Sequence, residues 1–181
     1  IDRAAKQVEF EGGERLPYDR LLIATGSHPI RPPVPGMDLP NVHTCWTLDD
    51  ARAIAAKAKP GARVLQLGAG FIGCIIMEAL AARGTKLTIV EMGDRMVPRM
   101  MTAKAGAMIK QWVEKKGVAV HVNSAITAIE QKGSELAVKV GASDTVMADL
   151  VICAAGVRPN IGFLAGSGVD IGRGIHVDSH T

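Results

Sequence analysis

Three glycines with the spacing G-x-G-x-x-G lie within the segment VLQLGAGFIGCIIMEAL, Val64 to Leu80. The apolar run before them is typical of a strand, and the pattern after them is typical of a helix. At such a turn the first glycine permits a tight bend, the second lets backbone amides approach a diphosphate, and the third allows close packing of helix on strand. The helix N-terminus offers unpaired N–H groups and partial positive charge to the diphosphate. The predicted cradle comprises Gly68, Ala69, Gly70, Phe71, Ile72 and Gly73.

A carboxylate follows this turn at the position that a dinucleotide site requires. Glycines also occur at strand-to-helix turns for packing alone, so the motif by itself is weak evidence. Glu91 ends the next strand-like run 18 residues after Gly73, close to the expected spacing of about 20. A glutamate there can accept hydrogen bonds from both ribose hydroxyls of NAD, and its charge repels the 2′-phosphate of NADP. We therefore predict NAD as the cofactor, with Glu91 and the adjacent Met92 in its site.

Two arginines after Glu91 bear on the choice of cofactor. Arg95 or Arg99 could reach a phosphate group, and Arg99 is included among the predicted cofactor-binding residues. Alternatively, both are surface charges that balance Glu91 and Asp94. The sequence favours neither interpretation.

Several other chemistries find no support in the residue pattern. There is no G-x-S-x-G elbow, and the five histidines form no triad or H-E-x-x-H arrangement, so a hydrolase is disfavoured and no catalytic residue is assigned. His176 and His180 have a ligand-like spacing, but the segment is typical of strand and loop, and surface histidines are the better interpretation. We predict no metal site.

Composition favours a globular cytoplasmic protein. The chain has 181 residues, a net charge of +3 and only six aromatic residues, which gives no stacking platform for nucleic acid. It shows no signal peptide and no apolar run of about 18 residues, so no membrane association is expected. Cys45, Cys74 and Cys153 are far apart and lie in or beside apolar runs, which is typical of buried free thiols in a reducing compartment.

The elements that must position the site alternate between strands and helices, which predicts an α/β fold with a Rossmann-like parallel sheet and an antiparallel β-meander. A strand and hairpin are expected around Val8 to Gly13, and a proline-rich linker or domain crossing from Pro29 to Pro40. Further strands are expected at residues 21–24, 64–67, 86–91, 118–122, 126–130, 136–140, 145–147, 150–153 and 175–177. Helices are expected at residues 47–59, 71–83 and 102–116. The last of these has an apolar face of Met101, Ala105, Met108, Ile109, Trp112 and Val113.

Three segments in order, YDRLLIATGSHPIRPPVPG, VLQLGAGFIG with Glu91, and ADLVICAAGVRPN, resemble the pyridine nucleotide-disulfide oxidoreductase family of flavoenzymes. The similarity covers nearly the whole chain. TLDDA before the central strand and EMGDRMVPRMM after it most resemble the branch of ferredoxin and rubredoxin reductases, NADH oxidases and the large subunit of NADH nitrite reductases. The resemblance implies an NAD-binding domain at residues 41–155, flanked by FAD-domain segments at 1–40 and 156–181.

The same resemblance places two crossings near the cofactors. Thr25 and Gly26 would lie near the flavin, and Ala155 and Gly156 near the nicotinamide side of NAD. The family's FAD fingerprint would precede Ile1, and its G-D motif would follow the last residue, so the sequence resembles the central piece of a larger enzyme. The reactive cysteines of some family members would also fall outside this sequence.

One position departs from the family pattern. GCIIM stands where the family usually has G-L-E-M-A or a similar segment, so Ile75 replaces a glutamate that lies near flavin and nicotinamide in the family. We expect a buried isoleucine, which cannot bind the carboxamide. Glu78 is three residues further on the helix and points elsewhere, so the glutamate's role is not transferred to it.

Two hypotheses for function follow. In the first, this is the NADH-binding part of an FAD-dependent oxidoreductase; it requires the remaining FAD domain and passes electrons to an unidentified acceptor, and alone it is inactive. In the second, it is a non-catalytic dinucleotide-binding or sensing module. Without their sheet partners, residues 1–34 and 157–181 should expose strand edges and apolar surface, which predicts self-association, for example as a homodimer.

Overall fold

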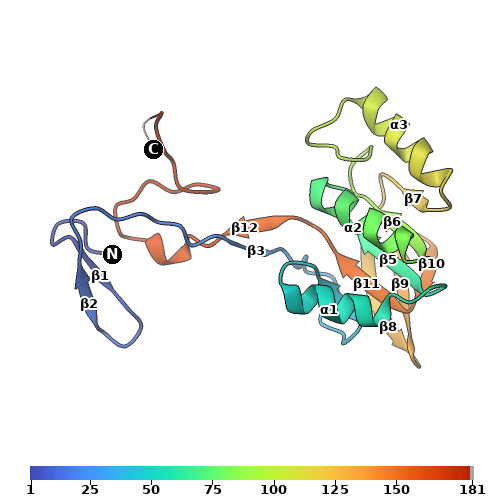
Figure 1. Cartoon of the computed structure of the whole chain (residues 1–181), viewed down its shortest axis with the longest axis horizontal. Helices are drawn as coiled ribbons and strands as arrows, with labels where there is room; N and C mark the ends of the chain where they lie inside the picture. The colour runs from blue at the N-terminus through green and yellow to red at the C-terminus, as the bar shows by residue number, and fades with distance from the viewer. Residues whose placement is uncertain (180–181) are drawn as a thin grey trace. The chain divides into compact units, whose positions relative to one another are not determined.

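A five-stranded parallel sheet forms the centre of the computed structural model, which describes residues 1–179 (Figure 1). Its strands lie in the order β4-β11-β5-β6-β7, and every neighbouring pair is parallel. Their bounds are β4 Val42–Thr44, β5 Arg63–Leu67, β6 Lys86–Val90, β7 Ala119–His121 and β11 Leu150–Cys153. The predicted α/β class is confirmed.

Three helices connect these strands, and local signals set their ends. They are α1 (Leu48–Lys57), α2 (Phe71–Ala82) and α3 (Ala103–Glu114). The Thr47 side chain accepts from the Asp50 N–H, and the Asp50 carboxylate accepts from the Thr47 N–H, so a capping box starts α1. The Thr102 side chain caps α3 by accepting from the Ala105 N–H, without the reciprocal side-chain bond. The three helices fall within the ranges that the sequence predicts.

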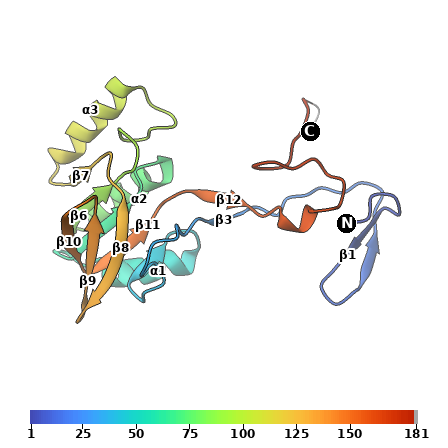
Figure 2. The same ribbon diagram turned by 180° about the vertical axis from the view of Figure 1, so that it is seen from behind.

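An antiparallel meander packs on the sheet face opposite α1 and α2 (Figure 2). It consists of β8 (Ile126–Lys132), β9 (Glu135–Val140) and β10 (Asp144–Ala148), as expected from the alternating pattern. Because alternate residues of a strand point to opposite faces, Val64 belongs to the core under the helices and Leu65 to the core under the meander. The sheet is therefore covered on both sides.

The chain divides into two compact units. Residues 29–156 form the sheet, helices and meander; in the proline-rich segment, Met37 is buried against the meander-side core. The other unit combines residues 1–28 with the described residues from 157 onward. It holds β1 (Gln7–Glu9) and β2 (Arg15–Pro17) in the expected hairpin, β12 (Val157–Pro159) and the 3-10 turn η1 (Gly162–Leu164). β3 (Ser27–Pro29), which pairs with β12, belongs to it up to His28.

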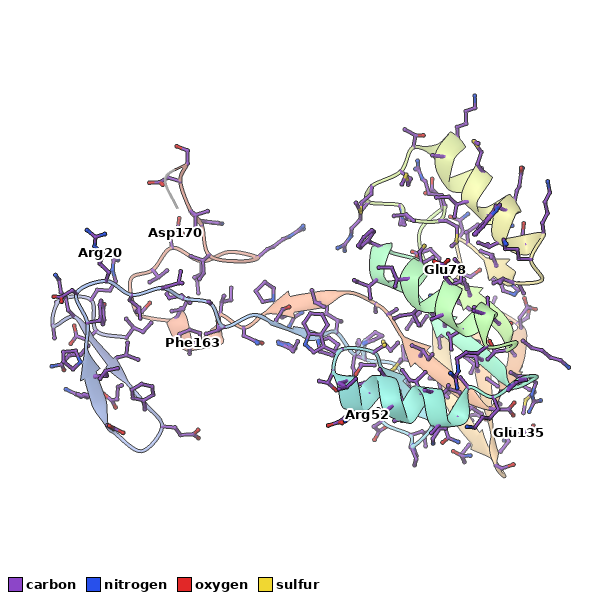
Figure 3. The ribbon with its side chains drawn as sticks, in the orientation of Figure 1. Arg20, Arg52, Glu78, Glu135, Phe163 and Asp170 are labelled. Atoms are coloured by element: carbon purple, nitrogen blue, oxygen red, sulfur yellow. The ribbon has the colours of Figure 1, made fainter. Side chains whose placement is uncertain are left out.

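The smaller unit exposes many of its apolar side chains. Leu164 is the one buried residue among its described residues. Phe163, on the same turn, is half exposed (Figure 3). Phe10, Leu16, Leu21, Leu22, Val157 and Val177 are also exposed. This agrees with the apolar surface expected for the two flanking segments.

Three expected features are wrong. Residues 21–24 form no strand: Leu22 is 87% exposed, and this run has no strand beside it among residues 1–179. The expected strand at 175–177 is reduced to one bridge between Ile171 and Ile175. In both cases an apolar run lacks the partner that a strand requires.

The third correction concerns the apolar face of α3. Met108 and Trp112 are 62% and 54% exposed, whereas Gly106 and Val113 are buried. Gly106 faces the Arg95 side chain and the Met96 carbonyl so closely that an added Cβ would lie 2.8 Å from each. The helix therefore docks through its small residue, which leaves part of the predicted face outside the core.

Candidate dinucleotide-binding site

Two glycines of the motif are required by the backbone around them. Gly68 follows β5 with φ of +98°, and a Cβ there would lie 2.4 Å from the Ala154 carbonyl oxygen. A Cβ at Gly73 would lie 2.7 Å from the Gly68 oxygen. Only glycine meets both conditions without a backbone shift. These two positions make the turn tight and bring α2 close to β5.

Gly70 differs, because the space beside it is open. It is the N-cap of α2, with φ of −72°, and a Cβ built there meets nothing within 4 Å. No side chain caps α2, and its first turn has no acidic residue, in contrast to the threonine caps of α1 and α3. The N–H groups and positive dipole end of α2 are thus available to an anionic group.

Glu91 is held beside this turn by two backbone amides. Its Oε2 accepts from the Ala69 N–H at 2.7 Å, and its Oε1 accepts from the Gly93 N–H at 2.7 Å. Its own N–H donates to the His121 carbonyl at 2.8 Å. An ionised carboxylate has about four acceptor positions, so both oxygens can still accept from hydroxyl groups. The structure therefore brings Glu91 and the glycine turn together in one site.

Exposed apolar side chains surround the turn. Phe71, Ile72 and Met92 are 60%, 49% and 71% exposed, whereas Ala69 is fully buried. Ile75 is 54% exposed, so the expectation that it is buried is wrong. It shares the outer side of α2 with Glu78 (Figure 3), which is also exposed and lies three residues further on, so the expectation that Glu78 points elsewhere is wrong. No carboxylate of α2 replaces Ile75, since Glu78 lies almost a full turn further along the helix.

Of the two arginines, Arg95 has a defined partner. It forms two hydrogen bonds with the Asp94 carboxylate, at 2.6 and 2.7 Å. These bonds hold the pKa of Asp94 below its usual value and raise the pKa of Arg95. Arg99 is exposed, and its proposed phosphate contact stays a prediction.

The site lies where strand order changes direction. From β5 the chain continues to β6 and β7 on one side, whereas β11 and β4 lie on the other. Open α/β sheets bind ligands at the carboxyl ends of strands beside such a switch point. Ala155 and Gly156 follow β11 at this edge, and the Ala154 N–H donates to the Leu67 carbonyl at 2.8 Å. Gly156 has φ of +100° and is exposed.

Thr25 and Gly26 lie in the smaller unit, where Asn160 holds them. The Thr25 hydroxyl donates to the Asn160 carbonyl at 2.8 Å, and the Asn160 side-chain amide donates to the Thr25 carbonyl at 2.9 Å. The Asn160 N–H donates to the Gly26 carbonyl at 2.9 Å. The sequence did not single out Asn160, although it ends the VRPN segment. The flavin contact of Thr25 and Gly26 stays a prediction.

The sequence also missed Gln66, a polar residue inside the apolar run VLQL. It is fully buried, and its Nε2 donates to the carbonyls of Gly68 and Gly73. The signal that could have indicated it is the amide itself, since a buried strand position normally takes an apolar residue.

Two hollows lie outside the predicted cradle. One, of about 330 Å³, lies between α2, the segment 97–101 and α3; it is mainly apolar and touches the cradle only through Phe71. The other, of about 390 Å³, lies at the amino ends of β5 and β6, where Arg63 and Lys86 line it. Because the glycine turn is at the carboxyl end of β5, this second hollow does not belong to the same site.

The remaining expectations concern cysteines, metals and membranes. Cys153 is buried and Cys45 and Cys74 are half-buried, all as free thiols, and burial raises the pKa of each. Within residues 1–179 there is no group of three or more potential metal ligands; His180 lies outside the described residues. No helix in this range has the length and apolar character needed to span a bilayer.

Comparison with known proteins gives consistent results over the whole chain. Residues 1–181 match the family model described as pyridine nucleotide-disulphide oxidoreductase. The sequence is 33% identical over 179 residues to the ferredoxin–NAD(+) reductase component of a biphenyl dioxygenase system from Paraburkholderia xenovorans. This match covers 99% of the chain and 44% of the relative. The chain therefore spans less than half the length of this relative.

Solved structures agree with this result. A ferredoxin reductase from Rhodopseudomonas palustris matches with a TM-score of 0.89 and 28% identity, over 97% of this chain and 44% of that one. A water-forming NADH oxidase from Lactobacillus brevis, solved with bound NADH, matches with a TM-score of 0.84 and 29% identity, over 95% of this chain and 39% of that one. Because the family model matches residues 1–181 of this chain, the chain belongs to the pyridine nucleotide-disulphide oxidoreductase family.

Proposed function

We propose that this chain is the NADH-binding part of an FAD-dependent oxidoreductase and presents NADH for hydride transfer to the flavin. The observation that carries the proposal is the Glu91 carboxylate, held on the Ala69 N–H directly beside the uncapped N-terminus of α2. A diphosphate and a ribose diol lie next to each other in a dinucleotide, and the site offers a matching pair of groups. Family membership supports the same assignment.

Different residues of the cradle would bind different parts of NADH. The first N–H groups of α2 would receive the diphosphate, because Gly70 leaves space for close approach. Glu91 would accept the adenosine ribose hydroxyls with the acceptor positions that Ala69 and Gly93 leave free. The same carboxylate would repel a 2′-phosphate, which favours NADH over NADPH. Met92 would flank the ribose, and the contact of Arg99 with a phosphate remains part of the proposal.

No acid, base or nucleophile is required of this chain. Nicotinamide and flavin supply the hydride donor and acceptor, so the protein's contribution is orientation and exclusion of competing reactions. By the resemblance, Ala155 and Gly156 would lie toward the nicotinamide, and Thr25 and Gly26 toward FAD. The remaining FAD domain and an electron acceptor, not identified by these residues, would complete the enzyme. We propose that this chain alone does not turn over NADH.

The exposed Ile75 favours a second candidate, a dinucleotide-binding or sensing module without turnover. An isoleucine cannot donate or accept a hydrogen bond at the position where the resemblance places a glutamate. Bound flavin in the full-length parent distinguishes the two candidate functions. If the parent holds FAD and the FAD absorbance is bleached on addition of NADH, the parent is an oxidoreductase. A parent that binds NADH and holds no flavin is a binding module.

The first test is calorimetric titration of the 181-residue chain with NADH and, separately, with NADPH. Saturable NADH binding, with NADPH clearly weaker, is the expected result. If neither nucleotide binds a chain whose circular dichroism shows it to be folded, the proposal that these residues suffice for the site is refuted.

A further inference from the structure

Gln66 connects the two tight glycines of the cradle. It is fully buried in β5, and its Nε2 donates to the Gly68 carbonyl at 2.8 Å and to the Gly73 carbonyl at 2.9 Å. The first bond joins the strand end to its own turn, and the second joins it to the first turn of α2. One side chain therefore sets the spacing between the turn and the helix that follows it.

Gln66 and Glu91 bind opposite ends of the same peptide group, the one between Gly68 and Ala69. In a trans peptide the carbonyl and the N–H lie in one plane and point in opposite directions, and residues 1–179 contain no cis peptide bond. Gln66 holds the carbonyl of the Gly68–Ala69 peptide, and Glu91 holds its N–H at 2.7 Å. The plane is thus fixed at both ends. The chain of contacts continues from Glu91 to the Gly93 N–H.

A glutamine at this position has an unfavourable feature. Its Oε1 is buried and has no hydrogen-bond partner among the described residues. A buried acceptor without a partner is destabilising, and an apolar side chain would avoid it. The other residues of β5 from Val64 to Leu67 are apolar and buried. Packing alone therefore does not explain why an amide stands in the middle of this strand.

We propose that Gln66 is a positioning residue of the dinucleotide site. It fixes the Gly68–Ala69 peptide so that the Ala69 N–H stays directed at Glu91, and it fixes the first turn of α2 against β5. The inference rests on the proposed function, because the residue acts through Glu91 and the N–H groups of α2. Without it, the glycine at φ of +98° allows the peptide to rotate. Glu91 then loses one of its two fixed partners.

Gln66→Met tests this role with little change in shape. Methionine is also long and unbranched, but it lacks both the N–H donor and the unpartnered amide oxygen of Gln66. Val64→Ala is the matched control: Val64 is 1% exposed, lies two residues earlier on the same face of β5, and has an apolar side chain that cannot hydrogen-bond to either carbonyl. A purely structural effect should follow the loss of stability, which Val64→Ala also causes because it opens a cavity.

The first measurement is amide hydrogen exchange by NMR on the 181-residue chain without nucleotide. In Gln66→Met the Ala69 amide should exchange at least about tenfold faster relative to the β6 amides, as expected for loss of a charge-assisted hydrogen bond. In Val64→Ala this ratio should not change. An unchanged Ala69 ratio in Gln66→Met overturns the proposal.

The second measurement is titration of the same variants with NADH and NADPH. We expect the Kd for NADH to rise about tenfold in Gln66→Met, with a smaller difference between the two nucleotides, and to stay constant in Val64→Ala. Faster Ala69 exchange with unaltered NADH affinity refutes the positioning role. If the unaltered chain fails to bind NADH, the proposed function fails, and the exchange result still decides whether Gln66 fixes the peptide. If Gln66→Met does not fold, the side-chain amide protons of Gln66 in the unaltered chain decide, since rapid exchange of these protons contradicts the two hydrogen bonds.

Discussion

Replacing Gly68 by alanine should destabilise the fold through two separate effects. The native φ of +98° lies in the region that residues with a Cβ rarely adopt, which costs about 1–2 kcal/mol. The new methyl group would also lie 2.4 Å from the Ala154 carbonyl oxygen, and forcing backbone apart in a packed interior costs about 1–3 kcal/mol. Alanine also reduces the conformational entropy of the unfolded chain, which offsets about 0.4–1 kcal/mol of this destabilisation. We expect the free energy of unfolding to fall by roughly 3 kcal/mol.

Gly70→Ala is the control within the same motif. Its φ of −72° suits alanine, and nothing lies within 4 Å of the new methyl group. Gly70→Ala should lower the free energy of unfolding by at most about 1 kcal/mol, because alanine is a poorer N-cap than glycine. Instead it should lower the affinity for NADH by at least about tenfold, because the methyl group occupies the space that the diphosphate would enter.

Urea unfolding followed by far-ultraviolet circular dichroism measures the first effect. The helices α1, α2 and α3 all belong to residues 29–156, so the helical signal reports on the unit that contains the turn. With a slope of about 2 kcal/mol per molar urea, Gly68→Ala should lower the midpoint by about 1.5 M and Gly70→Ala by less than about 0.5 M. Equal midpoints for Gly68→Ala and the unaltered chain would refute the reasoning from backbone crowding. Unchanged NADH affinity in a folded Gly70→Ala would refute the diphosphate assignment.

Three further predictions concern charge and association. Glu91→Gln removes the negative charge at the ribose position, so the affinity for NADPH should come closer to that for NADH. Asp144→Asn, at an exposed carboxylate on the meander, should not alter the ratio of the two affinities. Equal effects of the two variants contradict the role of Glu91. Asp149 accepts from the Arg63 side chain and backbone N–H, which lowers the pKa of its carboxyl group. A lowered folded-state pKa stabilises the fold above the unfolded value of about 3.9, and this stability is lost as pH falls through the folded value. Acid unfolding curves of Asp149→Asn should therefore be less steep below about pH 4, and an identical curve contradicts the ion pair's contribution. The apolar side chains exposed on the unit that contains both ends of the chain predict concentration-dependent self-association, and light scattering that shows a strict monomer over a wide concentration range rejects this.

Local sequence signals predicted the parts of the fold that local physics controls. Three features each depend on residues that are close together in the sequence: the Thr47 capping box, the glycine turn after β5 and the alternation in the meander. The pairing of Glu91 with the turn also followed from spacing, because adjacent parallel strands bring their carboxyl ends together. These are the features on which the candidate site depends.

Features set by distant partners could not be predicted in this way. Residues 21–24 have the composition of a strand, yet no neighbouring strand is present among residues 1–179 to pair with them. The periodicity of α3 identified an apolar face, but the close contact of Gly106 with Arg95 decides which part of it is buried. The role of Gln66 depends on where two carbonyl groups point, which spacing does not reveal.

The three glycines of the motif carry different information about function. Gly68 and Gly73 are crowded by the protein's own backbone, so the fold would require them even if the chain had lost its ligand. Gly70 is under no such constraint, and serine, aspartate or asparagine would cap the free N–H groups of α2 better than glycine does. A glycine at this N-cap is therefore costly to the helix unless a ligand uses those N–H groups and the space beside them. Gly70 and Glu91 are therefore the residues of this motif that indicate a binding site, and they are the two positions where substitution should separate binding from stability.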